Sequence, residues 1–194
     1  MRKRGLDDRL IALLDQAEAL RDTRLIAAFP EHQVQLPGGA RPSQTDVWAI
    51  LRATGGLVSL AVEGKAGETF GETVADWRAS HSDGKERRLQ FLRDAIGQTG
   101  PLDDTLRYQL FHRTASAVIE ADRLGAEAAV MIVLSFAPDD RSKADFVAFA
   151  SSIGVEGAPG RLARTTLKSG RQLFLGWLDV ECCNDAQIAA IPSE

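Results

Sequence analysis

Cysteine, histidine and long hydrophobic runs are all scarce in this chain of 194 residues. The two cysteines, Cys182 and Cys183, are adjacent, so they cannot staple distant parts of the fold, and they lack the spacing of metal ligands. No stretch approaches the roughly 18 uninterrupted apolar residues of a membrane span. The basic start, Met1–Arg4, is followed by Asp7 and Asp8 instead of the apolar block of a signal peptide. We therefore expect a cytoplasmic protein with no membrane partner.

An excess of basic charge is also absent. The chain carries 23 lysines and arginines against 27 aspartates and glutamates, a net charge of −4. This balance excludes a protein that coats nucleic acid with a general basic surface, but it leaves room for an enzyme with a local basic site. The phosphate-binding GxxxxGK[ST] loop, the dinucleotide-binding GxGxxG turn, the GxSxG nucleophile elbow and the HExxH zinc motif are absent.

The hydrophobic pattern predicts an α/β domain with a mixed sheet flanked by helices. Helices are expected at 6–28, within 73–97 around a polar break at 80–84, and at 104–124 and 142–153; strands are expected at 34–36, 46–53, 57–65, 128–136 and 172–180. Phe29-Pro30 is predicted to end the first helix, and Gly125 is predicted to cap the C-terminus of the helix at 104–124. With no repeat and no linker, the pattern indicates a single domain over residues 1–194.

The informative segment is a predicted hairpin with a two-residue turn at Gly55-Gly56. This turn would place Asp46 opposite Lys65. Because side chains alternate between the faces of a strand, Asp46, Glu63 and Lys65 are expected to share one face, while the other face is entirely apolar. The hairpin thus predicts two carboxylates and an ammonium group gathered at one end of a sheet.

Such a group suits metal-assisted hydrolysis of a phosphodiester. Asp46 and Glu63 would be diagonal neighbours, with Cβ atoms about 7–8 Å apart, so both carboxylates could reach one Mg²⁺ ion. Without a cation, two close carboxylates repel each other. Lys65 would offset part of this repulsion and would position or deprotonate the attacking water.

Asp46, followed by Glu63-Gly64-Lys65 at the end of the next strand, resembles the PD-(D/E)xK nuclease superfamily. Its members include restriction endonucleases and the RecB-like and Holliday-junction-resolving nucleases. The stretches VEGKAGETFG and RYQLFHRT are similar to an uncharacterised bacterial branch of that superfamily. Thr45 stands where the family motif has proline, a departure that touches no chemistry.

This resemblance implies a restriction endonuclease-like α-β-β-β-α-β core. It covers about residues 6–136, with a helical insertion at 73–97 and a C-terminal helix and strand at 142–180. It also implies a Mg²⁺-dependent nuclease, with Mn²⁺ as a substitute ion, that acts on DNA in bacterial defence or repair. Many restriction-type members dimerise to cut both strands, so a homodimer is a further expectation.

The resemblance also assigns roles to single residues. Asp46, Glu63 and the carbonyl of Gly64 are the implied metal ligands, and Lys65 is the implied water-positioning group. RecB-like relatives have a glutamine on the helix after the third strand, and Gln109 matches it. On the same predicted helix, His112 and Arg113 are candidates for contact with phosphate. Some members add a glutamate from the first helix, for which Glu18 is the candidate.

Three other interpretations stay open. A nuclease-like module without catalysis would bind DNA or a protein partner. An α/β protein with a small-molecule pocket could include Glu63 by chance. Finally, Glu63 and Lys65 could be a surface ion pair, with Asp46 capping a turn.

A basic run at 85–93 is either a phosphate-contacting surface or an ordinary solvated helix face.

Overall fold

The computed structural model describes residues 5–137 and 139–180; Met1–Arg4, Cys182 and Cys183 lie outside the described residues. The described elements are, in chain order, α1 (Asp8–Leu14), the short 3₁₀ helix η1 (Glu18–Leu20), β1 (Arg24–Val34), β2 (Ser43–Ala53), β3 (Gly56–Lys65), α2 (Val74–Arg78), α3 (Asp83–Ile96), α4 (Tyr108–Leu124), β4 (Ala128–Ser135), α5 (Asp140–Ser152), β5 (Leu162–Thr166) and β6 (Gln172–Asp179).

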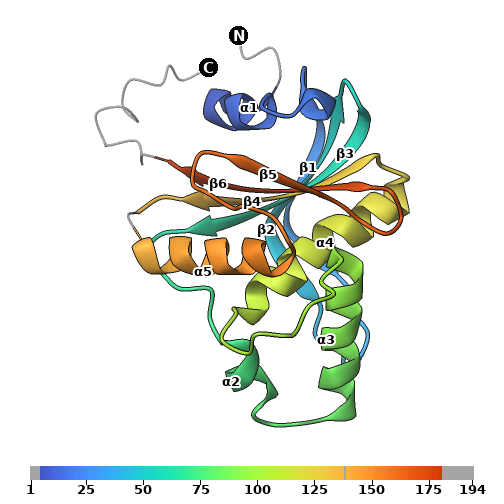
Figure 1. The fold of residues 1–194 in the computed structure, drawn as a ribbon. Helices are drawn as coiled ribbons and strands as arrows, with labels where there is room; N and C mark the ends of the chain where they lie inside the picture. Colours follow the sequence, from blue (N-terminus) through green and yellow to red (C-terminus); the bar gives the residue numbers. More distant parts are fainter. Residues whose placement is uncertain (1–4, 138, 181–194) are drawn as a thin grey trace.

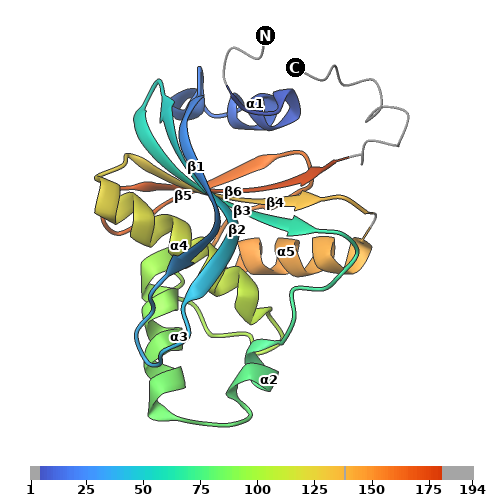
Figure 2. The same cartoon turned by 180° about the vertical axis from the view of Figure 1, so that it is seen from behind.

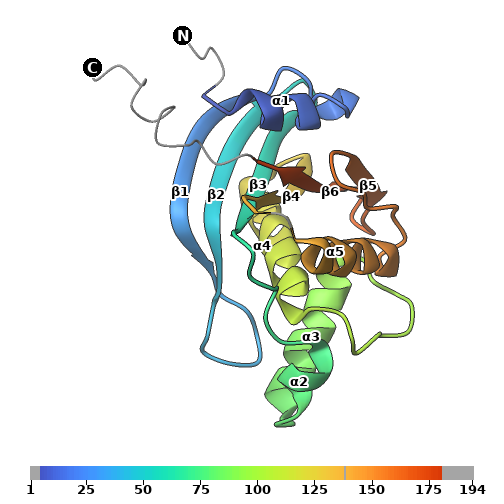
Figure 3. The same cartoon turned by 90° about the vertical axis from the view of Figure 1, so that its left-hand side faces the viewer.

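One mixed sheet contains all six described strands, in the spatial order β1-β2-β3-β4-β6-β5. The first three strands form an antiparallel meander, which curves away from the rest of the sheet (Figure 3). Strands β3, β4 and β6 are parallel to one another, and β5 is antiparallel to β6. The predicted α/β class with a mixed sheet is confirmed.

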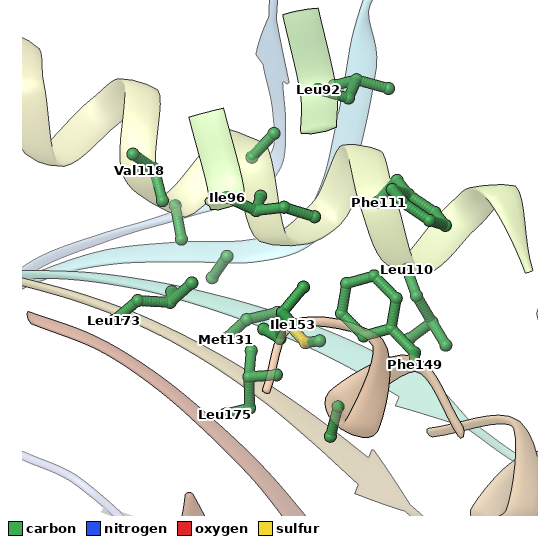
Figure 4. Packing of buried hydrophobic residues seen from close by; sticks show 14 of the residues in the cluster. Leu92, Ile96, Leu110, Phe111, Val118, Met131, Phe149, Ile153, Leu173 and Leu175 are labelled. Atoms are coloured by element: carbon green, nitrogen blue, oxygen red, sulfur yellow. The ribbon is translucent and has the colours of Figure 1, made fainter. Parts of the chain in front are cut away.

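Helices cover both faces of the sheet. α1 lies on one face, while α4 and α5 lie on the other, with α3 packed against α4 (Figures 1 and 2). On the α1 side, Leu13 and Leu14 pack with Leu60 and Ile132. The side chains on the other face form the larger cluster (Figure 4), which includes Leu92, Ile96, Leu110, Phe111, Val118, Met131, Phe149, Ile153, Leu173 and Leu175. β4 contributes to both clusters, as its doubly apolar sequence predicted.

The predicted first helix is wrong beyond its first turns. α1 ends at Leu14, and residues 24–28 belong to β1, where they pair with residues 49–52 of β2. Pro30 therefore lies inside a strand instead of ending a helix. β1 is an edge strand, so a proline without an N–H removes no hydrogen bond from a second neighbour. The predicted strand at 34–36 is also wrong, because only Val34 is in a strand, as the last residue of β1.

The hairpin forms, but its turn is one residue earlier than predicted. Ala53 pairs with Gly56, so the turn residues are Thr54 and Gly55. The partner numbers therefore sum to 109 and not to 111, the sum that the predicted turn implies. A shift of two keeps the side chains of the paired residues, 47–53 and 56–62, on their predicted faces. The predicted opposition of Asp46 and Lys65 is wrong, since the same register places Val47 opposite Val62.

The bounds of the remaining helices and strands agree with the predicted bounds within a few residues. α4 begins at Tyr108, four residues later than predicted, and Gly125 caps it in the left-handed conformation with φ 62°. The insertion contains α2 and α3 with the expected break between them. β5 was not predicted. Within the described part of the chain, no helix combines the length and the apolar character needed to cross a membrane.

Hydrogen bonds attach the connection between β1 and β2 to α3. The buried Arg88 donates hydrogen bonds from Nε to the Pro37 carbonyl at 2.9 Å and from one terminal nitrogen to the Gly39 carbonyl at 2.9 Å. Gly38 has φ +80°, and a Cβ there would lie 2.0 Å from the Gly84 carbonyl oxygen, so glycine is required. Arg88 thus holds a loop, and the basic run at 85–93 is not a uniformly solvated face.

Candidate functional site

Glu63 and Lys65 lie at the C-terminal end of β3, on the sheet face that α4 covers. They are 3% and 4% exposed, respectively. Lys65 Nζ donates to Glu63 Oε1 at 3.1 Å. This rules out the exposed surface pair among the open interpretations, because an ionisable pair this buried has lost most of its contact with water.

α4 brings two of the predicted residues onto this pair. Gln109 and Arg113 are one helical turn apart and so lie on one side of the helix. Gln109 Nε2 donates to Glu63 Oε1 at 2.6 Å, and Gln109 Oε1 accepts from Lys65 Nζ at 3.1 Å. Arg113 Nε donates to Glu63 Oε2 at 2.5 Å. Both oxygens of Glu63 therefore accept hydrogen bonds from side chains of the chain itself.

Glu63 pairs with two cations, so the three side chains carry one net positive charge. One carboxylate meets the ammonium of Lys65 and the guanidinium of Arg113. Taking charges out of water is costly, and this cost is offset only where partners and hydrogen bonds are complete. Removing the Glu63 carboxylate would leave both cations without a compensating charge.

His112 is held beside this cluster as a neutral ring. Burial, followed by the nearby cations Arg113, Arg88 and Lys65, lowers its pKa from 6.5 to about 3. Its Nδ1 lies 2.8 Å from the Ser43 hydroxyl and within 3.5 Å of an Arg113 terminal nitrogen. Arginine can only donate, so Nδ1 acts as the acceptor and the ring proton is assigned to Nε2.

Asp46 reaches the cluster through the backbone of β3. The Gly64 N–H donates to Asp46 Oδ2 at 2.7 Å. The carbonyl of Lys65 accepts from Phe136 N–H, next to β4. Backbone groups of successive strand residues point to opposite edges, so the N–H and C=O of Gly64 both face the edge occupied by Asp46. A Cβ at Gly64 would lie 3.4 Å from Asp46 Oδ2, which leaves little room for a side chain there.

The structure thus brings together most of the predicted residues. Glu63, Lys65, Gln109 and Arg113 share one hydrogen-bonded cluster, and His112 adjoins it. Glu18 does not join them. It lies in η1, whose next residue, Ala19, accepts a hydrogen bond from the Gly55 N–H in the hairpin turn. That turn is at the far end of β2 and β3 from Asp46 and Glu63, so Glu18 is not a ligand of this site.

The oxygen donors match Mg²⁺ in kind, subject to one condition. Among the described residues, no group of three or more His, Cys, Asp or Glu side chains could hold a metal. Mg²⁺, however, is commonly held by one or two carboxylates while it keeps several waters. Asp46, Glu63 and the Gly64 carbonyl supply such a set. The condition is that Glu63 exchanges Arg113 or Gln109 for the ion, because both of its oxygens are occupied.

A cleft of about 770 Å³ opens next to the cluster. Lys65, Gln109 and Arg113 form part of its wall. The other lining residues come from the end of β1, the start of β2 and the connection between them, from the segment after β3, and from helices α2 to α4: Gln33, Leu36, Arg41, Pro42, Ser43, Gln44, Thr69, Phe70, Gly71, Glu72, Trp77, Arg88, Tyr108 and His112. Neither Asp46 nor Glu63 is among the lining residues.

Ser43, Ser116 and Arg41 are site residues that the sequence analysis did not select. The Ser116 hydroxyl donates to that of Ser43 at 2.9 Å, and Ser43 contacts His112. Helical spacing alone could have found Ser116, which is one turn from His112. Arg41 lies in the loop before β2 and Ser43 is the first residue of that strand, so no periodicity marks either of them.

Comparison with known proteins gives a family. The model of the family described as "Domain of unknown function (DUF6946)" matches residues 1–182. The chain belongs to this family. No curated protein and no solved structure matches the chain. The DUF6946 match spans the β2–β3 hairpin and α4, so every residue of the cluster around Glu63 lies within the family domain.

Proposed function

We propose that this DUF6946 protein is a Mg²⁺-dependent nuclease of the PD-(D/E)xK type that hydrolyses phosphodiester bonds in DNA. The observation that carries the proposal is the double contact of Gln109, which donates to Glu63 and accepts from Lys65. Three residues selected from two distant segments converge at the end of β3. An unrelated helix face has no reason to supply this contact.

The arrangement of elements supports the same proposal. α1 is followed by the meander β1-β2-β3, and α4 then connects β3 to the parallel neighbour β4. This is the α-β-β-β-α-β order of the superfamily, with α2 and α3 as an insertion. Asp46 is on the second strand, and Glu63-Gly64-Lys65 ends the third.

Each residue has a role in the proposed reaction. Asp46, Glu63 and the Gly64 carbonyl would hold the ion, which lowers the pKa of a bound water and neutralises charge on the phosphate. Lys65 holds a proton at Nζ and orients the attacking water. Gln109 fixes Lys65 through its Oε1 atom. Arg113, once released from Glu63, supplies a guanidinium to a phosphate oxygen.

A cleavage assay tests this function. Wild-type protein with Mn²⁺ should nick plasmid or single-stranded DNA, and Lys65→Ala should abolish nicking while Mn²⁺ binding persists. The matched control is Lys168→Ala, which removes an exposed lysine far along the chain from the site. Equal cleavage by wild type and Lys65→Ala would show that the activity does not come from this site.

One observation favours a second candidate, a nuclease-like module that binds nucleic acid without cutting it. Lys65, Gln109 and Arg113 donate to both Glu63 oxygens, so the carboxylate already has partners without an ion. Isothermal titration with Mn²⁺ separates the two candidates. A nuclease binds the ion and loses it on Glu63→Gln, whereas a silent module binds no ion in either form.

A further inference from the structure

We infer that the cleft beside Glu63 and Lys65 holds one unpaired nucleotide of a single-stranded nucleic acid, next to the phosphate that the site attacks. The identification of the ligand as nucleic acid rests on the proposed function. The shape and charge of the cleft add the requirement that the strand be unpaired. The outer wall of the cleft is built by the β1–β2 connection and the α2–α3 segment. The requirement for an unpaired strand therefore comes from segments of this chain outside the cluster around Glu63.

The charge of the cleft favours a phosphodiester. Four cationic side chains line it, namely Arg41, Lys65, Arg88 and Arg113, against one acidic residue, Glu72. Glu63, behind the wall, balances one more positive charge, which leaves a surplus of two. Arg88 is committed to loop carbonyls, and Lys65 and Arg113 to Glu63.

Arg41 is the cation that is ready to receive a ligand. Its side chain is exposed and makes no hydrogen bond or ion pair within the part of the chain that the structure describes. The loop that carries it is held by Arg88, so Arg41 starts from a backbone that is already fixed. An arginine in this position suits a phosphate oxygen, with which it can form two parallel hydrogen bonds.

The size and lining of the cleft indicate what accompanies the phosphate. A volume of about 770 Å³ is in the range of small-molecule sites and is far too small for a duplex. Gln33 and Thr69 give the wall an amide oxygen and a hydroxyl that can meet a base edge or a sugar. The Ser43 hydroxyl is already bonded to Ser116, and the Gln33 amide nitrogen donates to Gln44. A base can enter such a concave site only when it is unpaired or turned out of its stack.

One wall contains a natural reporter. Tyr108 is the only tyrosine of the chain, and its ring stacks on Trp77 with the ring centroids 3.9 Å apart. A tyrosine label therefore gives one resonance, which reports on this wall. Filling the cleft changes the surroundings of that ring, whereas binding elsewhere on the molecule does not.

The test is binding in EDTA, where cleavage cannot occur. The probes are a mixed-sequence DNA strand of about ten nucleotides, its duplex with the complementary strand, and dAMP; binding is read by fluorescence anisotropy, or by competition for dAMP. We expect the strand to bind about tenfold more tightly than the duplex or dAMP and to shift the Tyr108 resonance. Arg41→Gln should weaken strand binding about three- to tenfold and reduce the salt dependence by about one phosphate contact.

Two further variants complete the design. Thr69→Trp, on an exposed loop of the wall, should fill the cleft and block strand binding with the fold intact. Arg164→Gln, which removes an exposed arginine on the opposite edge strand β5, should bind as wild type does. A preference for duplex or for dAMP, an unmoved Tyr108 resonance, or an Arg41→Gln protein equal to Arg164→Gln would overturn the inference. Loss of cleavage with intact strand binding would instead count against the proposed function alone.

Discussion

The side chain on which the site depends is Glu63. Its side chain is 4% exposed, and it faces two cations and one amide donor. In a buried site, the cost of an unpaired charge exceeds the gain from a well-formed pair. Glu63 is therefore needed for stability in the metal-free protein, in addition to its proposed role as a ligand.

Replacing Glu63 with glutamine should destabilise the protein. The change leaves Lys65 and Arg113 as two buried cations without a carboxylate, a loss we put at about 3–5 kcal/mol. Thermal melting in EDTA should show a decrease on the order of 10 °C for a chain of this size. Glu156→Gln, at an exposed position, is the control and should melt as wild type does. An unchanged melting temperature for Glu63→Gln would mean that the cations are not held by Glu63.

Arg113 should compete with the ion for Glu63. Arg113→Met keeps much of the side-chain length and frees Glu63 Oε2, so the metal-free protein should melt lower while Mn²⁺ raises its melting temperature more than that of wild type. Arg123→Met is the matched control on the same helix, because Arg123 forms an ion pair with Glu120 through a side chain that is 52% exposed. If Mn²⁺ stabilises Arg113→Met and wild type equally, Arg113 does not compete with the ion for the Glu63 carboxylate.

His112 predicts a dependence of stability on pH. Its pKa is about 3 in the folded protein and 6.5 in the unfolded chain, so below pH 6.5 the unfolded chain takes up a proton that the folded protein does not. The contribution of His112 is therefore complete above pH 6.5 and is lost as the pH falls towards 3.

Urea unfolding at pH 7 and pH 5 measures this effect. Between these values, wild type should lose about 2 kcal/mol more than His112→Asn, whose side-chain oxygen can still accept from Ser43. His81→Gln, at a side chain that is 68% exposed, should follow wild type. Parallel losses in wild type and His112→Asn would show that the ring is not held neutral.

At the scale of elements, the β1–β2 connection shapes the cleft. It is attached to α3 by Arg88 and by the close approach of Gly38 to Gly84. The loop then leads directly into β2, which carries Ser43 and Asp46. The position of α3 therefore sets the outer wall of the site, even though α3 contributes no residue to the cluster around Glu63.

Removing the Arg88 side chain should release this loop. Arg88→Met loses the hydrogen bonds to the Pro37 and Gly39 carbonyls, so amide hydrogen exchange across residues 35–42 should accelerate by at least tenfold, while β4 and β6 remain protected. Arg87→Met, at the exposed neighbouring position, is the control. Exchange rates equal to those of Arg87→Met would show that other contacts hold the loop.

The hairpin shows how much of the site the sequence could predict. Alternation fixes the face of each side chain, and the register shift of two preserves it, so the grouping of Glu63 with Lys65 could be predicted. The turn itself could not, because its position depends on a distant segment. The N–H groups of Thr54 and Gly55 donate to the carbonyls of Arg21 and Ala19 at 2.9 Å, contacts that no local pattern contains.

The predicted helix at the N-terminal segment was wrong for a related reason. Residues 24–28 are apolar enough to continue a helical stripe, but pairing with β2 decides their conformation. The helix periodicity of α4, in contrast, predicted which side Gln109 and Arg113 share. It could not predict that Arg113 would form an ion pair with Glu63, because ion pairs between distant elements follow from packing and not from spacing.

At the scale of the whole molecule, the DUF6946 domain combines the sheet and α4 with the segments that enclose the cleft. The sheet with α4 positions Asp46, Glu63 and Lys65, while the β1–β2 connection and the α2–α3 segment enclose the neighbouring cleft. Asp46 and Glu63 are proposed to hold one ion. Binding of this ion requires Arg113 or Gln109 to move away from Glu63, a rearrangement that can be observed directly.

The decisive measurement is a crystal structure of the protein soaked in millimolar Mn²⁺, with anomalous diffraction to locate the ion. We predict one anomalous peak between the Asp46 and Glu63 carboxylates, close to the Gly64 carbonyl, with Arg113 or Gln109 moved away from Glu63. Ligand distances should be near the roughly 2.0–2.1 Å found for Mg²⁺. A structure with no peak at this position, and with Arg113 and Gln109 still bound to Glu63, would show that Asp46 and Glu63 do not hold an ion.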